Sequence, residues 1–235
     1  APVATWGSVR LLFILTLLNG WHTQQLDFVQ AYQQAPLEKD LYMKIPKGFD
    51  ISKEVDNPEE YLLKIHRNIY GQKDAGRNWN QYLVKKLEKI GFKQSSIDEC
   101  VFYKGNTLYI VYTDNSILAG PDKEEIKQIQ RDMKKVGLQI TEEGNLYDFL
   151  GVNIDRRVDG TISLTQPTLI NTCLEELRLS QQNVTPKLTP AASSRILKRH
   201  PDSKPHDGSF HNRSIIGNLA YMEKGSRPDI AYAVH

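Results

Sequence analysis

Short runs of alternating apolar and polar residues and longer runs with helical spacing follow one another along the chain. Alternation predicts half-buried strands, and apolar residues at every third or fourth position predict helices. The expected strands are 23–29, 41–45, 61–66, 101–103, 108–112, 116–119, 149–154 and 161–164. The expected helices are 8–19, 74–90, 122–136, 167–177, 213–223 and 230–234. Residues 1–155 mix helices with antiparallel strands, and the region beyond 165 is mainly helical. This pattern predicts an α+β fold.

Polar residues mark several of the helix ends. Asp74 and Asp122 are suited to cap the helices that follow them, and Glu125 completes a capping box with Asp122. The helix over 8–19 is apolar on nearly every side and stops at Asn19-Gly20. A helix that is apolar all round is expected to be buried.

The stretch 107–120 predicts a tight hairpin with chemistry at its tip. Two β-rich apolar runs flank Thr113-Asp114-Asn115, and the Asp-Asn pair tolerates the positive φ of a short turn. A carboxylate at such a tip is held rigidly and faces outward, which suits a metal ligand. The same residues are favoured in turns for backbone reasons alone, so the hairpin by itself does not decide between a site and a simple turn.

Asp27 is the candidate partner for Asp114. It lies in the strand-like run 25–29, where an unpaired buried carboxylate would be costly. A strand-borne aspartate and a hairpin-tip aspartate can converge at one edge of a sheet. Mg²⁺ is usually held by one or two carboxylates together with substrate phosphates. Spacing alone is a weak argument, because a chain with 28 acidic residues offers many such pairs.

Composition is that of an ordinary globular protein. The 235 residues include 30 Lys+Arg and 28 Asp+Glu, so a net charge of +2 neither requires nor excludes a polyanionic partner. Two cysteines without a CxxC spacing argue against a disulfide framework or a structural zinc site. No signal peptide is visible, and the apolar run 11–18 is too short to span a membrane.

Basic and aromatic residues on two of the predicted helices allow two interpretations. Lys85-Lys86 and Lys134-Lys135 can follow nucleic-acid phosphates, but solvated helix faces carry such pairs as a rule. Trp79 and Tyr82 share the apolar face of the helix 74–90. We expect them in the core rather than as platforms for bases.

A series of ordered blocks identifies a family. The blocks are 1–3, 8–12, 25–32, 41–49, 69–79, 98–103, 112–115, 148–151, 189–190, 213–219 and 227–233. In these blocks, and over almost its whole length, the chain resembles the reverse transcriptase of copia-type LTR retrotransposons. Many separate matches in the same order make chance an unlikely source.

The resemblance implies a fold and a division of the chain. The fold is a polymerase palm, an antiparallel sheet backed by helices, with partial fingers and a mainly helical C-terminal thumb and connection part. Residues 1–155 are expected to form partial fingers and palm, and 156–184 the end of the primer-grip hairpin and the start of the thumb. Residues 185–212 are expected to be a linker, and 213–235 the start of the connection.

The resemblance also implies the site residues. Asp27 and Asp114 match the metal-binding carboxylates, with Asn115 in the next catalytic position. Tyr32 matches an aromatic gate that excludes a 2′-hydroxyl. Phe28, Tyr70 and Gly71 match residues that bind the nucleotide. The primer grip is matched by Phe149, Leu150 and Gly151. The implied cofactors are two Mg²⁺ ions, with Mn²⁺ as a substitute. The implied partners are an RNA or DNA template with primer and deoxynucleoside triphosphates, and no membrane is implied. The implied location is intracellular, in a cytoplasmic retroelement particle or in the nucleus.

Two departures from the family pattern bear on activity. Asn115 stands where the family has a second Asp, and a neutral amide is a weaker Mg²⁺ ligand than a carboxylate. We therefore expect activity that is reduced, metal-sensitive or absent. No block for the basic fingers strands precedes Ala1 and no ribonuclease H segment follows, so we expect this piece alone to extend primers poorly.

Two other functions stay open from the sequence. One is a catalytically inactive retroelement remnant or nucleic-acid-binding scaffold, which Asn115 favours. The other is an unrelated Mg²⁺-dependent hydrolase that uses Asp27 and Asp114. Nuclease activity without primer extension would identify the second.

Overall fold

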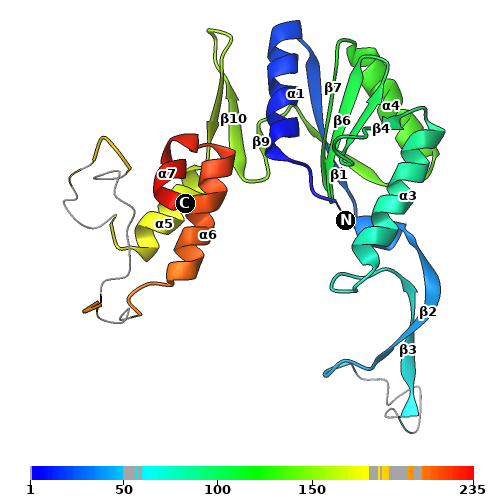
Figure 1. Ribbon diagram of the computed structural model, residues 1–235. Coiled ribbons are helices and arrows are strands. Elements are labelled where there is room, and N and C mark those ends of the chain that lie inside the picture. The colour runs from blue at the N-terminus through cyan, green and yellow to red at the C-terminus, as the bar shows by residue number, and fades with distance from the viewer. Residues whose placement is uncertain are drawn as a thin grey trace. The chain divides into compact units, whose positions relative to one another are not determined.

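The computed structural model describes residues 2–49, 57, 60–179, 185, 187–190, 201–203 and 208–235. Most of residues 50–60 and of the expected linker at 185–212 lies outside these residues. The chain forms two compact units, Ala1–Leu146 and Tyr147–His235. Each unit has its own elements, which Figure 1 shows in chain order by colour. The first unit ends before residue 155, where the sequence places the end of the palm.

A six-stranded antiparallel sheet is the centre of the first unit. Its order is β4 (Lys93–Gln94), β5 (Val101–Lys104), β6 (Thr107–Tyr112), β7 (Asn115–Gly120), β1 (His22–Phe28) and β8 (Ile140–Gly144). The pairs β4–β5, β5–β6 and β6–β7 are neighbours in the chain, whereas β1 is inserted between β7 and β8. β1 is therefore a central strand, with a hydrogen-bonded neighbour on each side.

Two helices, α3 (Ala75–Lys89) and α4 (Lys123–Lys135), cover one face of this sheet (Figure 1). Their apolar residues meet every second residue of the central strands in one buried cluster. The helix residues in that cluster are Trp79, Leu83, Leu87, Ile126, Ile129 and Met133, and the strand residues include Leu26, Phe28, Tyr109, Val111 and Leu118. The sheet backed by helices confirms the predicted α+β fold.

α1 (Trp6–Asn19) lies on the other side of the sheet (Figure 1) and is held at its start by a buried carboxylate. Asp98 accepts hydrogen bonds from the Thr5 backbone N–H at 3.1 Å and from the Ser8 hydroxyl at 2.6 Å. The prediction that this helix is buried all round is wrong. Leu11, Ile14 and Leu18 are exposed, because a helix can turn only one of its faces to a sheet.

A short helix and a long hairpin complete the first unit. α2 (Ala31–Gln34) follows β1, and β2 (Pro36–Lys44) pairs with β3 (Leu62–Arg67) in a separate two-stranded sheet. The hairpin extends away from the six-stranded sheet in Figure 1. It returns the chain to α2, so that the start of β2 and the segment after β3 lie close together.

The second unit has a small sheet and several helices. Its strands are β9 (Asp148–Phe149), β10 (Val152–Arg156) and β11 (Ile162–Thr165), and its helices are α5 (Pro167–Glu176), α6 (Asn212–Gly225), η2 (Pro228–Ile230) and α7 (Ala231–Val234). Cys173, Ile215 and Met222 form its buried cluster. The expected single strand 149–154 is wrong, because Leu150 (φ 53°) and Gly151 (φ 71°) turn the chain back on itself.

Each unit contains one buried free cysteine, Cys100 in the first and Cys173 in the second. Burial, with Asp98 and Glu99 nearby, raises the pKa of the Cys100 thiol to about 12. Burial also raises the pKa of the Cys173 thiol. Both thiols are therefore protonated and unreactive at neutral pH in the folded chain. Among the described residues no helix has the length and apolarity to cross a membrane.

Candidate active site

The hairpin between β6 and β7 has a loop of two residues. Tyr112 pairs with Asn115, so Thr113 and Asp114 form the loop and Asn115 begins β7. The sequence predicts the positive φ of this turn on the Asp-Asn pair. That prediction is wrong, because the positive φ, 59°, is at Thr113. A β-branched residue rarely adopts this conformation. The Trp79 indole N–H donates to the Thr113 carbonyl oxygen at 2.9 Å and so holds the turn from α3.

Asp27 lies beside this turn at the end of β1. Its neighbours across the sheet are Asn115 on β7 and Thr141 on β8. The Phe28 backbone N–H donates to the Asp114 carbonyl oxygen at 2.9 Å, so β1 continues its hydrogen bonding into the loop. Asp27, Asp114 and Asn115 are thus brought together at one end of the sheet. Their catalytic role stays a prediction.

A buried hydroxyl chain joins the three strands beneath these residues. The Tyr109 hydroxyl on β6 donates to Ser116 Oγ on β7 at 2.9 Å, and that hydroxyl donates to the Leu26 carbonyl oxygen on β1 at 3.0 Å. Tyr109, Ser116 and Leu26 are all fully buried. The register between Asp27 and the turn at Asp114 is therefore fixed by side chains as well as by the backbone.

The carboxylates repel one another. Partial burial raises the pKa of Asp27, and the charges of Asp114 and Glu143 raise it further. Glu143 is the extra residue of a β-bulge, because Gln25 pairs with Gly144 and Leu26 with Glu142. Neither Glu143 nor β8 is predicted by the sequence pattern, because only Ile140 of this strand is apolar and no alternation is visible.

Two tyrosines face each other near the carboxylates. The ring centroids of Tyr32 on α2 and Tyr70 after β3 are 4.7 Å apart, with the rings tilted by 51°. Partial burial raises the pKa of Tyr70, and the charges of Asp114 and, less strongly, Asp27 add to the effect. Gly71 follows with a φ of 84°, a turn conformation that favours glycine. Tyr32, Tyr70 and both aspartates therefore belong to one region of the first unit.

Phe28 is placed differently from the other predicted nucleotide residues. Its side chain is buried, and its ring meets that of Trp79 edge to face with a centroid distance of 4.9 Å. The side chain therefore contributes to the core, and a contact with a nucleotide would come from the Phe28 backbone. Trp79 is buried as well, which confirms that it belongs to the core.

The predicted primer grip forms the β9–β10 turn in the second unit. Phe149 is buried, and Leu150 and Gly151 are the turn residues with positive φ. The Leu150 carbonyl oxygen accepts a hydrogen bond from the Tyr221 hydroxyl on α6 at 2.7 Å. The turn is thus fastened to the helical part of its own unit.

Three of the four candidate phosphate-binding lysines have partners within the protein. Lys86 donates to the Val136 carbonyl oxygen, Lys134 pairs with Glu142 at 2.7 Å, and Lys135 pairs with Asp132 at 3.2 Å. These partners favour the interpretation of solvated helix faces over that of a phosphate track.

The donor set suits a divalent cation that is shared with a substrate. Asp27 and Asp114 supply two carboxylates whose mutual repulsion a cation would relieve. No group of three or more His, Cys, Asp or Glu side chains in the described part of the chain is arranged to hold a metal ion by itself. Mg²⁺ commonly binds one or two carboxylates and completes its shell with water and phosphates. The residues present fit that mode.

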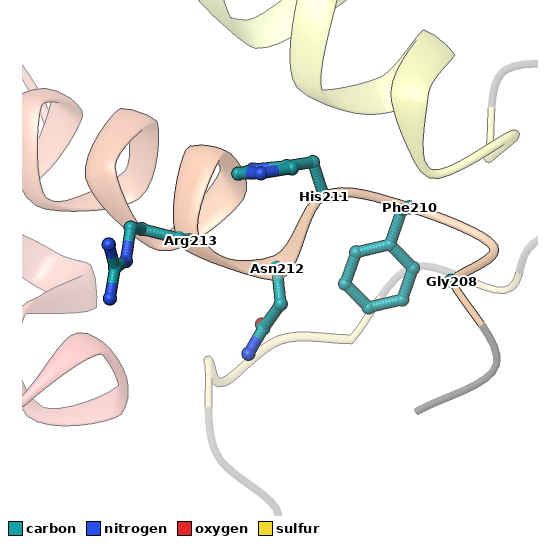
Figure 2. A pocket seen from close by; sticks show the side chains of 5 residues that line it. All are labelled: Gly208, Phe210, His211, Asn212 and Arg213. Atoms are coloured by element: carbon teal, nitrogen blue, oxygen red, sulfur yellow. The ribbon is translucent and has the colours of Figure 1, made fainter. Parts of the chain in front are cut away.

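A separate surface hollow of about 470 Å³ lies in the second unit at the start of α6 (Figure 2). Its lining residues are Gly208, Phe210, His211, Asn212 and Arg213. His211 caps α6, and its Nδ1 accepts a hydrogen bond from the Ser214 backbone N–H at 3.2 Å. None of the predicted site residues lines this hollow.

The antiparallel sheet backed by helices has the architecture of a polymerase palm. Family comparison agrees with this class. The profile of the family described as "Reverse transcriptase (RNA-dependent DNA polymerase)" matches residues 1–192, and the chain belongs to this family.

Similar proteins come from plant and yeast transposons. The chain is 27% identical over its whole length to the retrovirus-related Pol polyprotein from transposon TNT 1-94 of Nicotiana tabacum, and covers 18% of it. It is 30% identical over its whole length to the corresponding polyprotein from transposon RE2 of Arabidopsis thaliana, and covers 16% of it. A putative transposon Ty5-1 protein of Saccharomyces cerevisiae is 27% identical over 89% of the chain and 67% of that protein. The resemblance to copia-type elements is confirmed, and the chain spans less than a fifth of the two plant polyproteins.

Proposed function

We propose that this chain is the RNA-directed DNA polymerase domain of a copia-type retrotransposon polyprotein. The reaction is attack of a primer 3′-hydroxyl on the α-phosphate of a deoxynucleoside triphosphate, directed by an RNA or DNA template, with pyrophosphate as the leaving group. The observation that carries the proposal is the pairing of Asp27 with the turn at Asp114 in a member of the reverse transcriptase family.

Asp27 and Asp114 are the proposed metal ligands. Divalent cations, Mg²⁺ or Mn²⁺, supply activation of the primer hydroxyl and neutralisation of the triphosphate when bound. The protein contributes rigid placement. Asp27 is fixed between β7 and β8, and Asp114 is fixed by its backbone bond to Phe28. Positioning of this kind accounts for much of the catalysis in phosphoryl and nucleotidyl transfer.

Other residues of the two units take the remaining proposed roles. Tyr32 excludes a 2′-hydroxyl, and Tyr70-Gly71 contact the incoming nucleotide. The turn at Phe149, Leu150 and Gly151 grips the primer end. The proposed partners are template, primer and deoxynucleoside triphosphates, and the proposed place of action is an intracellular retroelement particle.

Asn115 supports a second candidate, a catalytically inactive member of the family that still binds nucleic acid. Its amide Nδ2 lies 3.4 Å from Asp114 Oδ1 and brings no charge to the site. Two divalent cations would then be balanced by one carboxylate fewer than in the family pattern. We propose that polymerisation by this chain is impaired in Mg²⁺ for this reason.

Single-nucleotide extension of a labelled primer tests both candidates. The unsubstituted chain, Asn115→Asp and Asp27→Asn are compared in Mg²⁺ and in Mn²⁺, with one nucleotide added so that processivity does not matter. We expect Asn115→Asp to extend about 100- to 1000-fold faster in Mg²⁺, the order of magnitude of the rate lost when one electrostatic group is removed at a reacting centre. Asp27→Asn, the matched change of carboxylate to amide, should be inactive.

The outcomes separate the candidates. Equal rates for the unsubstituted chain and Asn115→Asp in Mg²⁺ would show that Asn115 does not impair the site. No extension by any variant, with binding of primer–template retained, would favour the inactive scaffold. Cleavage of nucleic acid without extension would indicate a hydrolase.

A further inference from the structure

Asn68 is a buried polar residue that none of the roles above uses. It lies between β3 and Tyr70, and none of its surface is accessible to solvent. Buried amide side chains are costly unless their donors and acceptors are paired. In Asn68 both the amide nitrogen and the amide oxygen make two hydrogen bonds. Its full hydrogen-bonding capacity is therefore used.

The amide nitrogen of Asn68 binds the segment that carries Tyr32. It donates to the Ala35 carbonyl oxygen at 2.9 Å and to the Pro36 carbonyl oxygen at 3.2 Å. These two residues follow α2, and the Ala35 backbone N–H donates in turn to the Tyr32 carbonyl oxygen at 3.3 Å. Asn68 thus fixes the end of the short helix on which Tyr32 stands.

The amide oxygen of Asn68 binds the segment that carries Tyr70 and the start of α3. It accepts from Gln72 Nε2 at 3.3 Å and from Asn78 Nδ2 at 3.0 Å. Gln72 also accepts from the Ile69 backbone N–H at 3.3 Å, which closes the turn around Tyr70. One side chain therefore holds both partners of the ring pair.

Packing alone does little to fix Tyr70. Its side chain is 56% exposed, and Gly71 after it leaves the backbone free to turn. The ring is placed against Tyr32 at a centroid distance of 4.7 Å while Asn68 ties the two backbones together. Without these hydrogen bonds, the distance between the rings depends on how far the end of α2 and the turn at Tyr70 can shift.

We propose that Asn68 is a positioning residue that sets the Tyr32–Tyr70 ring pair and thereby the preference of the site for deoxynucleotides over ribonucleotides. This inference rests on the proposed polymerase function. Asn68 does not touch the nucleotide itself. It acts through the two tyrosines, because a ring that shifts by about 1 Å opens room for a 2′-hydroxyl, and misplacement on this scale can change rates by about 100-fold.

Nucleotide binding without turnover tests the proposal. The chain is assembled with Mg²⁺ and a primer–template whose primer ends in a dideoxynucleotide. The apparent dissociation constants of dTTP and ribothymidine triphosphate, which differ only at the 2′ position, are compared opposite adenine. The variants are Asn68→Asp, which keeps the size and the acceptor oxygen but loses both donors toward α2, and Tyr32→Val, which removes the gate ring. Thr16→Val is the matched control, since Thr16 is buried on α1 and its hydroxyl binds the Leu12 carbonyl oxygen.

We expect the unsubstituted chain and Thr16→Val to prefer dTTP, and Asn68→Asp and Tyr32→Val to reduce that preference by about tenfold or more. Asn78→Ala, which removes one of the four bonds at the surface of the network, should shift the ratio less and in the same direction. It replaces Asn68→Asp if that variant does not fold.

Two results would overturn the inference, and each refutes a different part of it. A preference that is lost in Tyr32→Val but unchanged in Asn68→Asp and Asn78→Ala refutes the role of Asn68 alone. No preference for dTTP in the unsubstituted chain refutes the proposed selection of deoxynucleotides, and the role of Asn68 falls with it.

Discussion

Asp27 has a raised pKa because burial and two other carboxylates disfavour its charge. A raised pKa in the folded chain means that the charged form destabilises the fold. This penalty is absent below the unfolded value of 3.8, develops as pH rises through the folded pKa, and is complete above it. The candidate site therefore carries a charge arrangement that lowers the stability of the fold in the absence of a cation.

Asp27→Asn should accordingly stabilise the chain at neutral pH. We expect a melting temperature about 1–4 °C above that of the unsubstituted chain at pH 7, and no difference near pH 3. Thermal unfolding followed by circular dichroism at both pH values measures this. Glu143→Gln is the matched control at the bulge and should give a smaller shift in the same direction. A lower melting temperature for Asp27→Asn at pH 7 would contradict the prediction.

At the scale of single residues, the sequence predicts Asp27, Asp114 and Tyr32 as site residues because their order and spacing resemble a known family. Glu143 and Asn68 were not found, because a bulge in β8 and a set of four hydrogen bonds give them their places. Neither feature leaves a pattern in the neighbouring sequence.

At the scale of elements, the Tyr109–Ser116–Leu26 chain ties three strands together below the turn at Asp114. Removal of the middle hydroxyl takes from the buried Tyr109 hydroxyl its hydrogen-bond acceptor and from the Leu26 carbonyl oxygen one of its donors. An unsatisfied buried polar group costs about 1–3 kcal/mol. The loss is therefore larger than that of one ordinary hydrogen bond.

We expect Ser116→Ala to lower the free energy of unfolding by about 1–3 kcal/mol. Tyr109→Phe removes the stranded hydroxyl, so the double variant should be destabilised by less than the sum of the two single changes, with a coupling of about 0.5–3 kcal/mol. Urea unfolding of the four proteins in this cycle gives the coupling. Strict additivity would show that the hydroxyls do not act as a unit.

The elements themselves were predictable where periodicity or turn chemistry was strong. The hairpin at 107–120 and the helices now labelled α3 and α4 match their expected ranges closely. β8 was missed because its sequence, ITEEG, is polar along nearly its whole length. The β9–β10 turn was missed because Leu150 adopts a positive φ, which tertiary contacts such as the Tyr221 hydrogen bond support and which local propensity disfavours.

At the scale of the whole molecule, the first unit contains the complete six-stranded sheet and its main core. Its length lies within the range of independently folding domains, about 50–200 residues. The second unit is smaller, and its described buried cluster has only Cys173, Ile215 and Met222 at its centre.

A fragment of residues 1–146 should therefore fold alone. We expect a far-ultraviolet spectrum with both helix and strand signals and a single cooperative thermal transition. The fragment retains Asp27, Asp114 and Asn115 but lacks the turn at 149–151, so we expect folding without primer extension. A broad, non-cooperative transition would show that the first unit depends on the second.

The position of the two cysteines gives each unit its own intrinsic probe of opening. Cys100 and Cys173 are the only cysteines in the chain, and both are buried with raised pKa values. A thiol reagent reaches each one only when its surroundings open, so the labelling rate of each thiol measures the free energy of that opening. Mass spectrometry of the labelled chain distinguishes the two sites without any engineered label. Earlier modification of Cys173 than of Cys100 would reveal a state in which the six-stranded sheet persists while the second unit has already opened.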